Sequence, residues 1–97
     1  MTHDDSRAQH CADILKAVAH PVRLRIIALL CQGPQHVSGI CEQLELPQAI
    51  VSQQLRILRM RDLVQVTRSE GFAYYALKEM RLTDLVHCVE GCSVPAR

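Results

Sequence analysis

The chain has 97 residues, 48% of them apolar but only 3% aromatic, so a single small domain must build its core from aliphatic side chains and is helped by oligomerising. A formal net charge of +1 neither requires nor excludes a nucleic-acid partner. The polar opening segment is unlike a signal peptide, and no apolar run reaches membrane-spanning length, so a reducing cytoplasm is the expected location. Five cysteines, an odd number, indicate free thiols or thiolate ligands.

The first half of the chain predicts three helices. After a flexible arm over residues 1–8, apolar residues recur with helical spacing. A second helix is expected over about 21–32, because Pro21 suits a first helical turn and Gly33 a helix end. A third, shorter helix follows "GPQ". The apolar stripes of these helices are Cys11, Ile14, Leu15 and Val18; Leu24, Ile27, Ala28 and Cys31; and Val37, Ile40, Cys41 and Leu44.

The second half predicts a helix, a hairpin and a last helix. The helix after Pro47 directs Val51, Leu55 and Leu58 inward, with Ser52, Arg56 and Arg59 on the opposite face. "LVQVTRSEGFAYYAL" offers two alternating strands around "RSEG". "EMRLTDLVHCVEG" then carries the stripe Leu82, Leu85, Val86 and Val89, before a tail over 93–97. The expected fold is one mainly α (α+β) domain over 1–97, ordered helix-helix-helix-helix-hairpin-helix.

A short helix, a tight turn at "LELPQ" and a helix with a polar, basic outer face form a helix-turn-helix pattern, and the following hairpin makes it a winged one. The second helix of such a unit enters the major groove, where amides bond adenine and arginine suits guanine. The candidate DNA-binding residues are Gln48, Ser52, Gln53, Gln54 and Arg56 for bases, and Arg59, Arg61 and Arg68 for phosphates, with Arg68 on the wing.

Two blocks resemble the ArsR/SmtB family of winged-helix repressors. "LKAVAHPVRLRIIALL" is similar to the family's second helix, and "LPQAIVSQQLRILRMRDLVQVTRSEGFAYYAL" to its recognition helix and wing, over about residues 12–78. The resemblance implies a homodimer formed by the first and last helices. This dimer would bind an inverted repeat in double-stranded operator DNA without a cofactor and release it when an inducer binds. We find no phosphate-cradling Gly loop or Cys-His-acid arrangement in the sequence, so an enzyme is not expected.

The inducer positions of the family are matched only in part. Where arsenite sensors often carry Cys-Val-Cys on the third helix, "HVSGICEQL" has Cys41 alone. Asp84 and His87 resemble the Asp and His ligands of zinc and nickel sensors, at a different spacing and without a second His. "VSQQL" and the chain length are most similar to the branch that senses reactive sulfur with one cysteine on the second helix and one near the end of the last. Cys31 and Cys92 approximate those two places.

The two C-terminal cysteines are the main sensing candidates. Cys88 and Cys92 lie one turn and about 40° apart on a helix, which is chelating geometry, and neither is needed for packing. Two thiolates suit mercury-like ions and three suit arsenite or antimonite, with Cys11 or Cys31 as the third; Cys41 is expected to pack in the core.

Three functions follow from these residues. The first is a repressor released when its thiolates bind a thiophilic metal or metalloid such as arsenite. The second is the same repressor sensing oxidants or reactive sulfur through a disulfide or polysulfide between Cys92 and a second thiol. The third is a winged-helix protein-interaction module without an operator.

Overall fold

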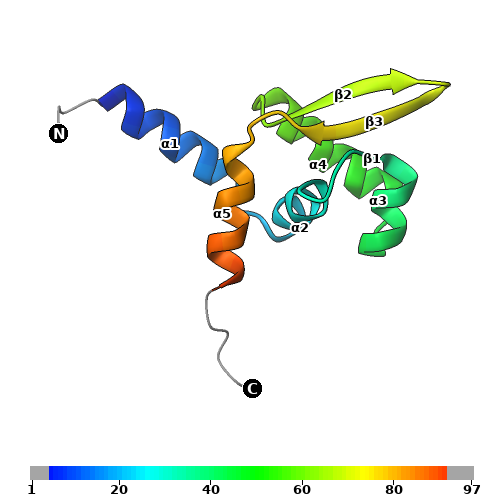
Figure 1. The fold of residues 1–97 in the computed structure, drawn as a ribbon, viewed down its shortest axis with the longest axis horizontal. Coiled ribbons are helices and arrows are strands. Elements are labelled where there is room, and N and C mark those ends of the chain that lie inside the picture. The colour runs from blue at the N-terminus through cyan, green and yellow to red at the C-terminus, as the bar shows by residue number, and fades with distance from the viewer. Residues whose placement is uncertain (1–4, 92–97) are drawn as a thin grey trace, which may run out of the picture.

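The computed structural model describes residues 5–91 of the chain (Figure 1). Within this range it confirms the expected winged helix-turn-helix. Its elements are α1 (Asp5–Val18), α2 (Pro21–Leu30), β1 (Gln35–His36), α3 (Val37–Leu44), α4 (Gln48–Met60), β2 (Val64–Ser69), β3 (Phe72–Leu77) and α5 (Arg81–Glu90). Figure 1 shows α1 and α5 projecting from a body formed by α2, α3, α4 and the sheet.

The sheet is antiparallel in the order β1-β3-β2. Strands β2 and β3 pair from Val64↔Leu77 to Ser69↔Phe72, as the hairpin pattern predicts. Glu70 (φ 50°) and Gly71 (φ 82°) form the loop between them, and two residues of positive φ suit the turn that best matches the twist of a hairpin. Strand β1, which the sequence does not predict, is only two residues long and pairs with the middle of β3.

Helix α2 lies at the centre of the core and is buried on more than one side. Ile26 and Ile27 are fully buried, and Leu29 and Leu30 nearly so. The predicted stripe was therefore wrong in part, because three of its members, Leu24, Ala28 and Cys31, are only half-buried. The reason is that α2 contacts α1, α3, α4, α5 and β3, so a one-sided helical pattern does not describe it.

Helix α1 begins earlier than the sequence suggests. Residues 5–8, which the sequence analysis placed in an N-terminal arm, are helical, while residues 1–4 and the predicted tail at 93–97 lie outside the described residues. Only Ala17 and Val18, at the end of α1, are buried. The remainder of α1 projects from the body (Figure 1). In the described range no helix has the length and apolar character needed to cross a membrane.

An imidazole caps the start of α2. His20 Nδ1 accepts hydrogen bonds from the backbone N–H groups of Val22 (3.1 Å) and Arg23 (3.4 Å), and Pro21 occupies the first helical position. These contacts satisfy amide donors that a helix N-terminus otherwise leaves without a partner.

Replacing His20 with alanine is expected to lower the free energy of unfolding by about 1 kcal/mol, because the cap acceptor is lost. Asparagine at this position supplies another acceptor and should recover most of the loss. Urea unfolding followed by circular dichroism measures both variants. Equal stability of the alanine variant and the parent would contradict the capping role.

Candidate DNA-reading face and sensor positions

The turn between α3 and α4 sets the orientation of the candidate recognition helix. Glu45 ends α3 in the left-handed region (φ 55°), and the Leu46 N–H donates to Cys41 O over 3.1 Å. Pro47 then precedes the first residue of α4. Because α4 packs on both α2 and α3, its inner face is held against the body and its outer face is left to solvent.

The outer face of α4 carries most of the predicted base-reading side chains. Gln48, Ser52, Gln53, Arg56 and Arg59 are all exposed. On the inner side, Val51, Leu55 and Leu58 are 0% exposed. The inward and outward sets are therefore divided as the spacing predicts, and one surface presents amide, hydroxyl and guanidinium groups together.

Gln54 corrects the predicted set. Its side chain is only 9% exposed, and Oε1 accepts a 3.1 Å hydrogen bond from Arg23 Nη1. Gln54 therefore faces the protein interior and is not available to a base edge. The sequence did contain a signal for this, since Gln54 lies three residues after Val51 and four before Leu58, on the side that the buried stripe occupies.

Arg23, which sequence reasoning missed, joins three helices. Besides Gln54 on α4, it bonds the end of α1, where its Nε donates to Ala17 O over 2.6 Å. The Ala17 carbonyl is one of the acceptors that a helix C-terminus leaves without an intrahelical partner. The Arg23 guanidinium thus donates hydrogen bonds both to a backbone carbonyl at the end of α1 and to the buried side-chain amide of Gln54 on α4.

The wing carries the remaining cationic candidate. Arg68 is exposed near the end of β2, opposite Ala73 on β3, and Glu70 is exposed in the loop beside it. Arg61, at the end of α4, is exposed as well. These positions fit the expectation that the basic groups lie on the surface and outside the core.

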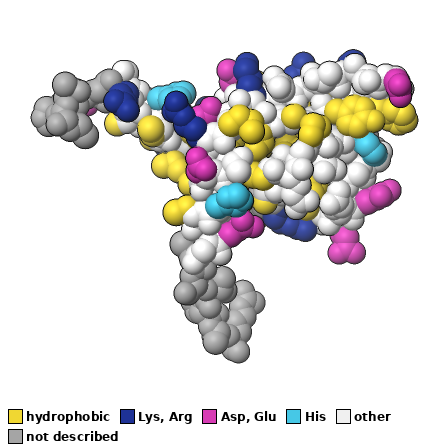
Figure 2. Space-filling model, in the orientation of Figure 1, with side chains coloured by type: hydrophobic (Ala, Val, Ile, Leu, Met, Phe, Trp, Pro, Cys, Tyr) yellow, Lys and Arg dark blue, Asp and Glu magenta, His cyan; other side chains and the backbone are white. Residues whose placement is uncertain are grey.

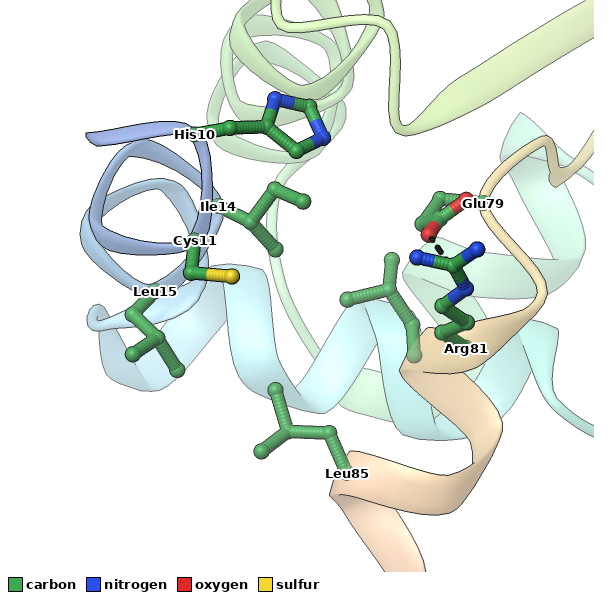
Figure 3. A pocket seen from close by; sticks show the side chains of 8 residues that line it. His10, Cys11, Ile14, Leu15, Glu79, Arg81 and Leu85 are labelled. Atoms are coloured by element: carbon green, nitrogen blue, oxygen red, sulfur yellow. Dashed lines mark ion pairs between the residues drawn. The ribbon is translucent and has the colours of Figure 1, made fainter. Parts of the chain in front are cut away.

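A groove runs between α1 and α5 (Figure 3). Its lining residues are His10, Cys11, Ile14, Leu15, Glu79, Arg81, Leu82 and Leu85. The floor is mostly aliphatic, and Arg81 pairs with Glu79 over 3.8 Å at one side. Leu15 is 52% exposed, and Figure 2 shows hydrophobic side chains gathered in the angle between the two helices. A single chain thus leaves an apolar face uncovered here.

The cysteines lie in different environments. Cys11 is exposed on the groove side of α1, where Figure 3 shows its sulfur directed toward α5. Cys88 is exposed on the last turn of α5, whereas Cys92 lies outside the described residues. Cys41 is half-buried against the core, in agreement with the packing role expected for it.

Cys31 lies near the start of α5 and not near its end. It caps the C-terminus of α2, is half-buried, and lines a hollow with Met80. Cys88 follows Met80 by two helical turns, roughly 12 Å along the helix axis. A disulfide requires Cα atoms within about 7 Å, a separation that Cys31 and Cys88 would have to reach for a bond within one chain.

Among residues 5–91, the candidate metal ligands form no cluster of three or more. Asp84 and His87 are exposed on α5. Across residues 5–91, no group of three or more His, Cys, Asp and Glu side chains is placed to hold a metal ion. A site of three or more such ligands that includes Cys88 would therefore take at least one of them from a second subunit or from residues outside this range.

Comparisons with known proteins agree with this arrangement. The model of the family described as "Bacterial regulatory protein, arsR family" matches residues 20–66. The biofilm growth-associated repressor of Xylella fastidiosa is 34% identical over 91 residues, which cover 92% of this chain and 80% of that protein. The crystal structure of the transcriptional repressor BigR from Xylella fastidiosa aligns with a TM-score of 0.85 at 33% identity, covering 97% of this chain and all of that one.

A third similarity concerns assembly. The homodimeric winged helix-turn-helix DNA-binding domain from Mycobacterium bovis, solved by NMR, aligns with a TM-score of 0.77 at 26% identity. The alignment covers 93% of this chain and 87% of that domain.

Proposed function

The chain belongs to the ArsR family of bacterial regulatory proteins and is a DNA-binding transcriptional repressor, not an enzyme; from this premise we propose that it binds an inverted-repeat operator as a homodimer. The homodimer leaves the operator when its cysteine thiolates bind a thiophilic metal or metalloid. Because the proposed partner is DNA, the proposed location is the cytoplasm. The third hypothesis, an interaction module without an operator, is not retained.

The observation that carries the DNA-reading part is the division of α4 into a buried face and an exposed face. Gln48 and Gln53 would bond adenine edges and Arg56 a guanine, with Ser52 beside them. Arg59 and Arg68 would neutralise phosphates and supply affinity without sequence information.

The groove between α1 and α5 supports the homodimer. Its aliphatic floor, with Leu15 and Leu85 on opposite helices, would be covered by the same face of a second copy. One recognition helix reads only a few base pairs, so two of them on symmetric half-sites give the specificity that a repressor needs.

Exposed thiols on both of these helices support the sensing part. Cys11 on α1 and Cys88 on α5 are accessible to a thiophilic ion. These two thiols would supply the two sulfurs that mercury takes. Cys92 or Cys31 would add the third sulfur that arsenite and antimonite take. An inducer held between the helices of the dimer would change the spacing of the two recognition helices, and so would bind the free and DNA-bound states differently.

Reactive sulfur remains the alternative inducer, because it requires only two thiols. A disulfide forms when two thiols lose two protons and two electrons to one persulfide donor, which is reduced to its thiol and hydrogen sulfide. A trisulfide forms when a second persulfide donor also transfers its outer sulfur atom into the bridge and leaves as a thiol. Cys88 is accessible to such a reagent, and Cys92 with Cys11 or Cys31 are the other candidate thiols.

The test begins with selection of bound duplexes from a random-sequence DNA library, followed by gel-shift titration of the best duplex. Enrichment of a two-fold symmetric sequence is expected, and failure to enrich any sequence would contradict the operator. The preformed complex is then titrated with arsenite, mercuric chloride or a persulfide donor. Mass spectrometry distinguishes a metal adduct from a covalent sulfur bridge.

Replacing both Cys88 and Cys92 with serine is expected to leave DNA affinity within about twofold of the parent, because neither residue lies on α4 or the wing. The same double variant is expected to lose release by the inducer. Gel shifts with and without inducer measure both effects. Cys41→Ala, at a half-buried thiol that packs on the core, is the matched control and should keep the response. A double variant that still releases DNA would move the sensor to Cys11 or Cys31.

A further inference from the structure

His36 contacts both the start of the helix-turn-helix and the outer part of the wing. On the helical side it is the N-cap of α3, where its Nδ1 accepts a hydrogen bond from the Gly39 N–H over 3.3 Å. On the wing side its backbone pairs with Tyr74 of β3. Its ring lies 6.0 Å from the Phe72 ring and 5.9 Å from the Tyr74 ring, measured between centroids.

The outer part of the wing extends beyond strand β1. Strand β1 pairs with Tyr74 and Tyr75, so beyond Tyr74 the hairpin is two-stranded in the described structure. A two-stranded ribbon is marginally stable in water. Phe72 is 57% exposed, and Figure 2 shows hydrophobic side chains near the end of the hairpin with a histidine beside them. The contact with the His36 ring therefore links this end to the body.

Arg68 shares this surface. It lies on β2 next to the Phe72 strand, and a shallow hollow on the protein is lined by His36, Arg68 and Phe72 together. A displacement of Phe72 would carry the paired strand and Arg68 with it.

We propose that His36 is a positioning residue for DNA binding, whose imidazole ring fixes the wing, and with it Arg68, relative to the recognition helix. The cap alone does not require a ring, since serine or asparagine supplies the same acceptor. The ring adds aromatic contacts to Phe72 and Tyr74, which serine cannot make. This inference rests on the proposed wing contact of Arg68.

The two roles of His36 are separated by a matched pair of variants. His36→Ser keeps a cap acceptor and removes the ring, and His36→Phe keeps a ring and removes the acceptor. Affinity for the library-selected duplex is measured by fluorescence anisotropy over a series of salt concentrations, with Arg68→Ala and the combination of His36→Ser and Arg68→Ala. Thermal unfolding is followed for every variant.

His36→Ser is expected to weaken DNA binding about as much as Arg68→Ala and to reduce the salt slope by the same amount, about one unit per wing. The combined variant should bind no more weakly than Arg68→Ala alone. His36→Phe should bind within about twofold of the parent while its unfolding midpoint falls by about 4–8 °C, the value for a lost cap in a domain of this size.

Additive losses in the combined variant, or equal losses in His36→Ser and His36→Phe, would overturn the proposal and leave His36 as a helix cap only. If Arg68→Ala itself binds like the parent, the proposed wing contact fails separately. The positioning role is then judged by amide exchange in residues 68–73. Faster exchange in His36→Ser than in His36→Phe supports it, and equal exchange overturns it.

Discussion

Replacing Arg56 with alanine is expected to weaken operator binding by about 30-fold or more, the largest loss of any single exposed residue on α4. Arg56 is exposed on the third turn of the helix, outside the stripe of the fully buried Val51 and Leu55. A guanidinium that bonds guanine at two atoms contributes about 1–3 kcal/mol of discrimination, and a homodimer loses two such contacts at once.

The control for this prediction is Arg59→Ala, one turn further along α4, where a phosphate contact is expected. Anisotropy titrations against duplexes with single base-pair changes separate the two roles. Arg56→Ala should flatten the preference at one base pair in each half-site, whereas Arg59→Ala should weaken all duplexes equally and lower the salt slope. A uniform loss in Arg56→Ala would assign Arg56 to the phosphates and contradict the prediction.

Replacing Leu15 with glutamate is expected to convert the protein to a monomer and to weaken operator binding by about 100-fold or more, because the two half-sites are then bound independently. Leu15 is 52% exposed on the aliphatic groove between α1 and α5. A carboxylate buried there without a partner would oppose association of the two apolar faces.

Sedimentation equilibrium measures the change in assembly, and gel shifts measure its consequence for DNA. The matched control is Met80→Glu, which introduces the same charge at a side chain that is 65% exposed but lines the hollow with Cys31. It should remain dimeric and bind DNA like the parent. A Leu15→Glu protein that still sediments as a dimer would place the interface on another surface.

The helix-turn-helix could be predicted from the sequence because its pattern is one-sided. Val51, Leu55 and Leu58 are spaced for one face of a helix and lie fully buried there. The same reasoning was less successful for α2, which is surrounded by other elements, so its burial does not follow a single stripe. It also missed β1, since two residues are too short to show alternation.

Residue chemistry was a weaker guide than residue position at the functional surfaces. Gln54 is a good base-reading side chain by type, but it lies in the buried stripe, where it accepts a hydrogen bond from Arg23. His20 and His36 cap helices, a role more often filled by serine, threonine, aspartate or asparagine, so neither was recognised as a cap. The arrangement of the thiols depends on contacts between helices, which periodicity within one helix does not report.

The Arg23 guanidinium makes α1 and α4 mechanically dependent on each other. Its planar group is rigid, so it keeps the 2.6 Å bond to Ala17 O and the 3.1 Å bond to Gln54 Oε1 only while the two helices hold their present separation. A tilt of α1 must either carry α4 along or break one of these bonds. Motion on the side of the molecule remote from the base-reading surface therefore has a direct route to that surface, through one side chain.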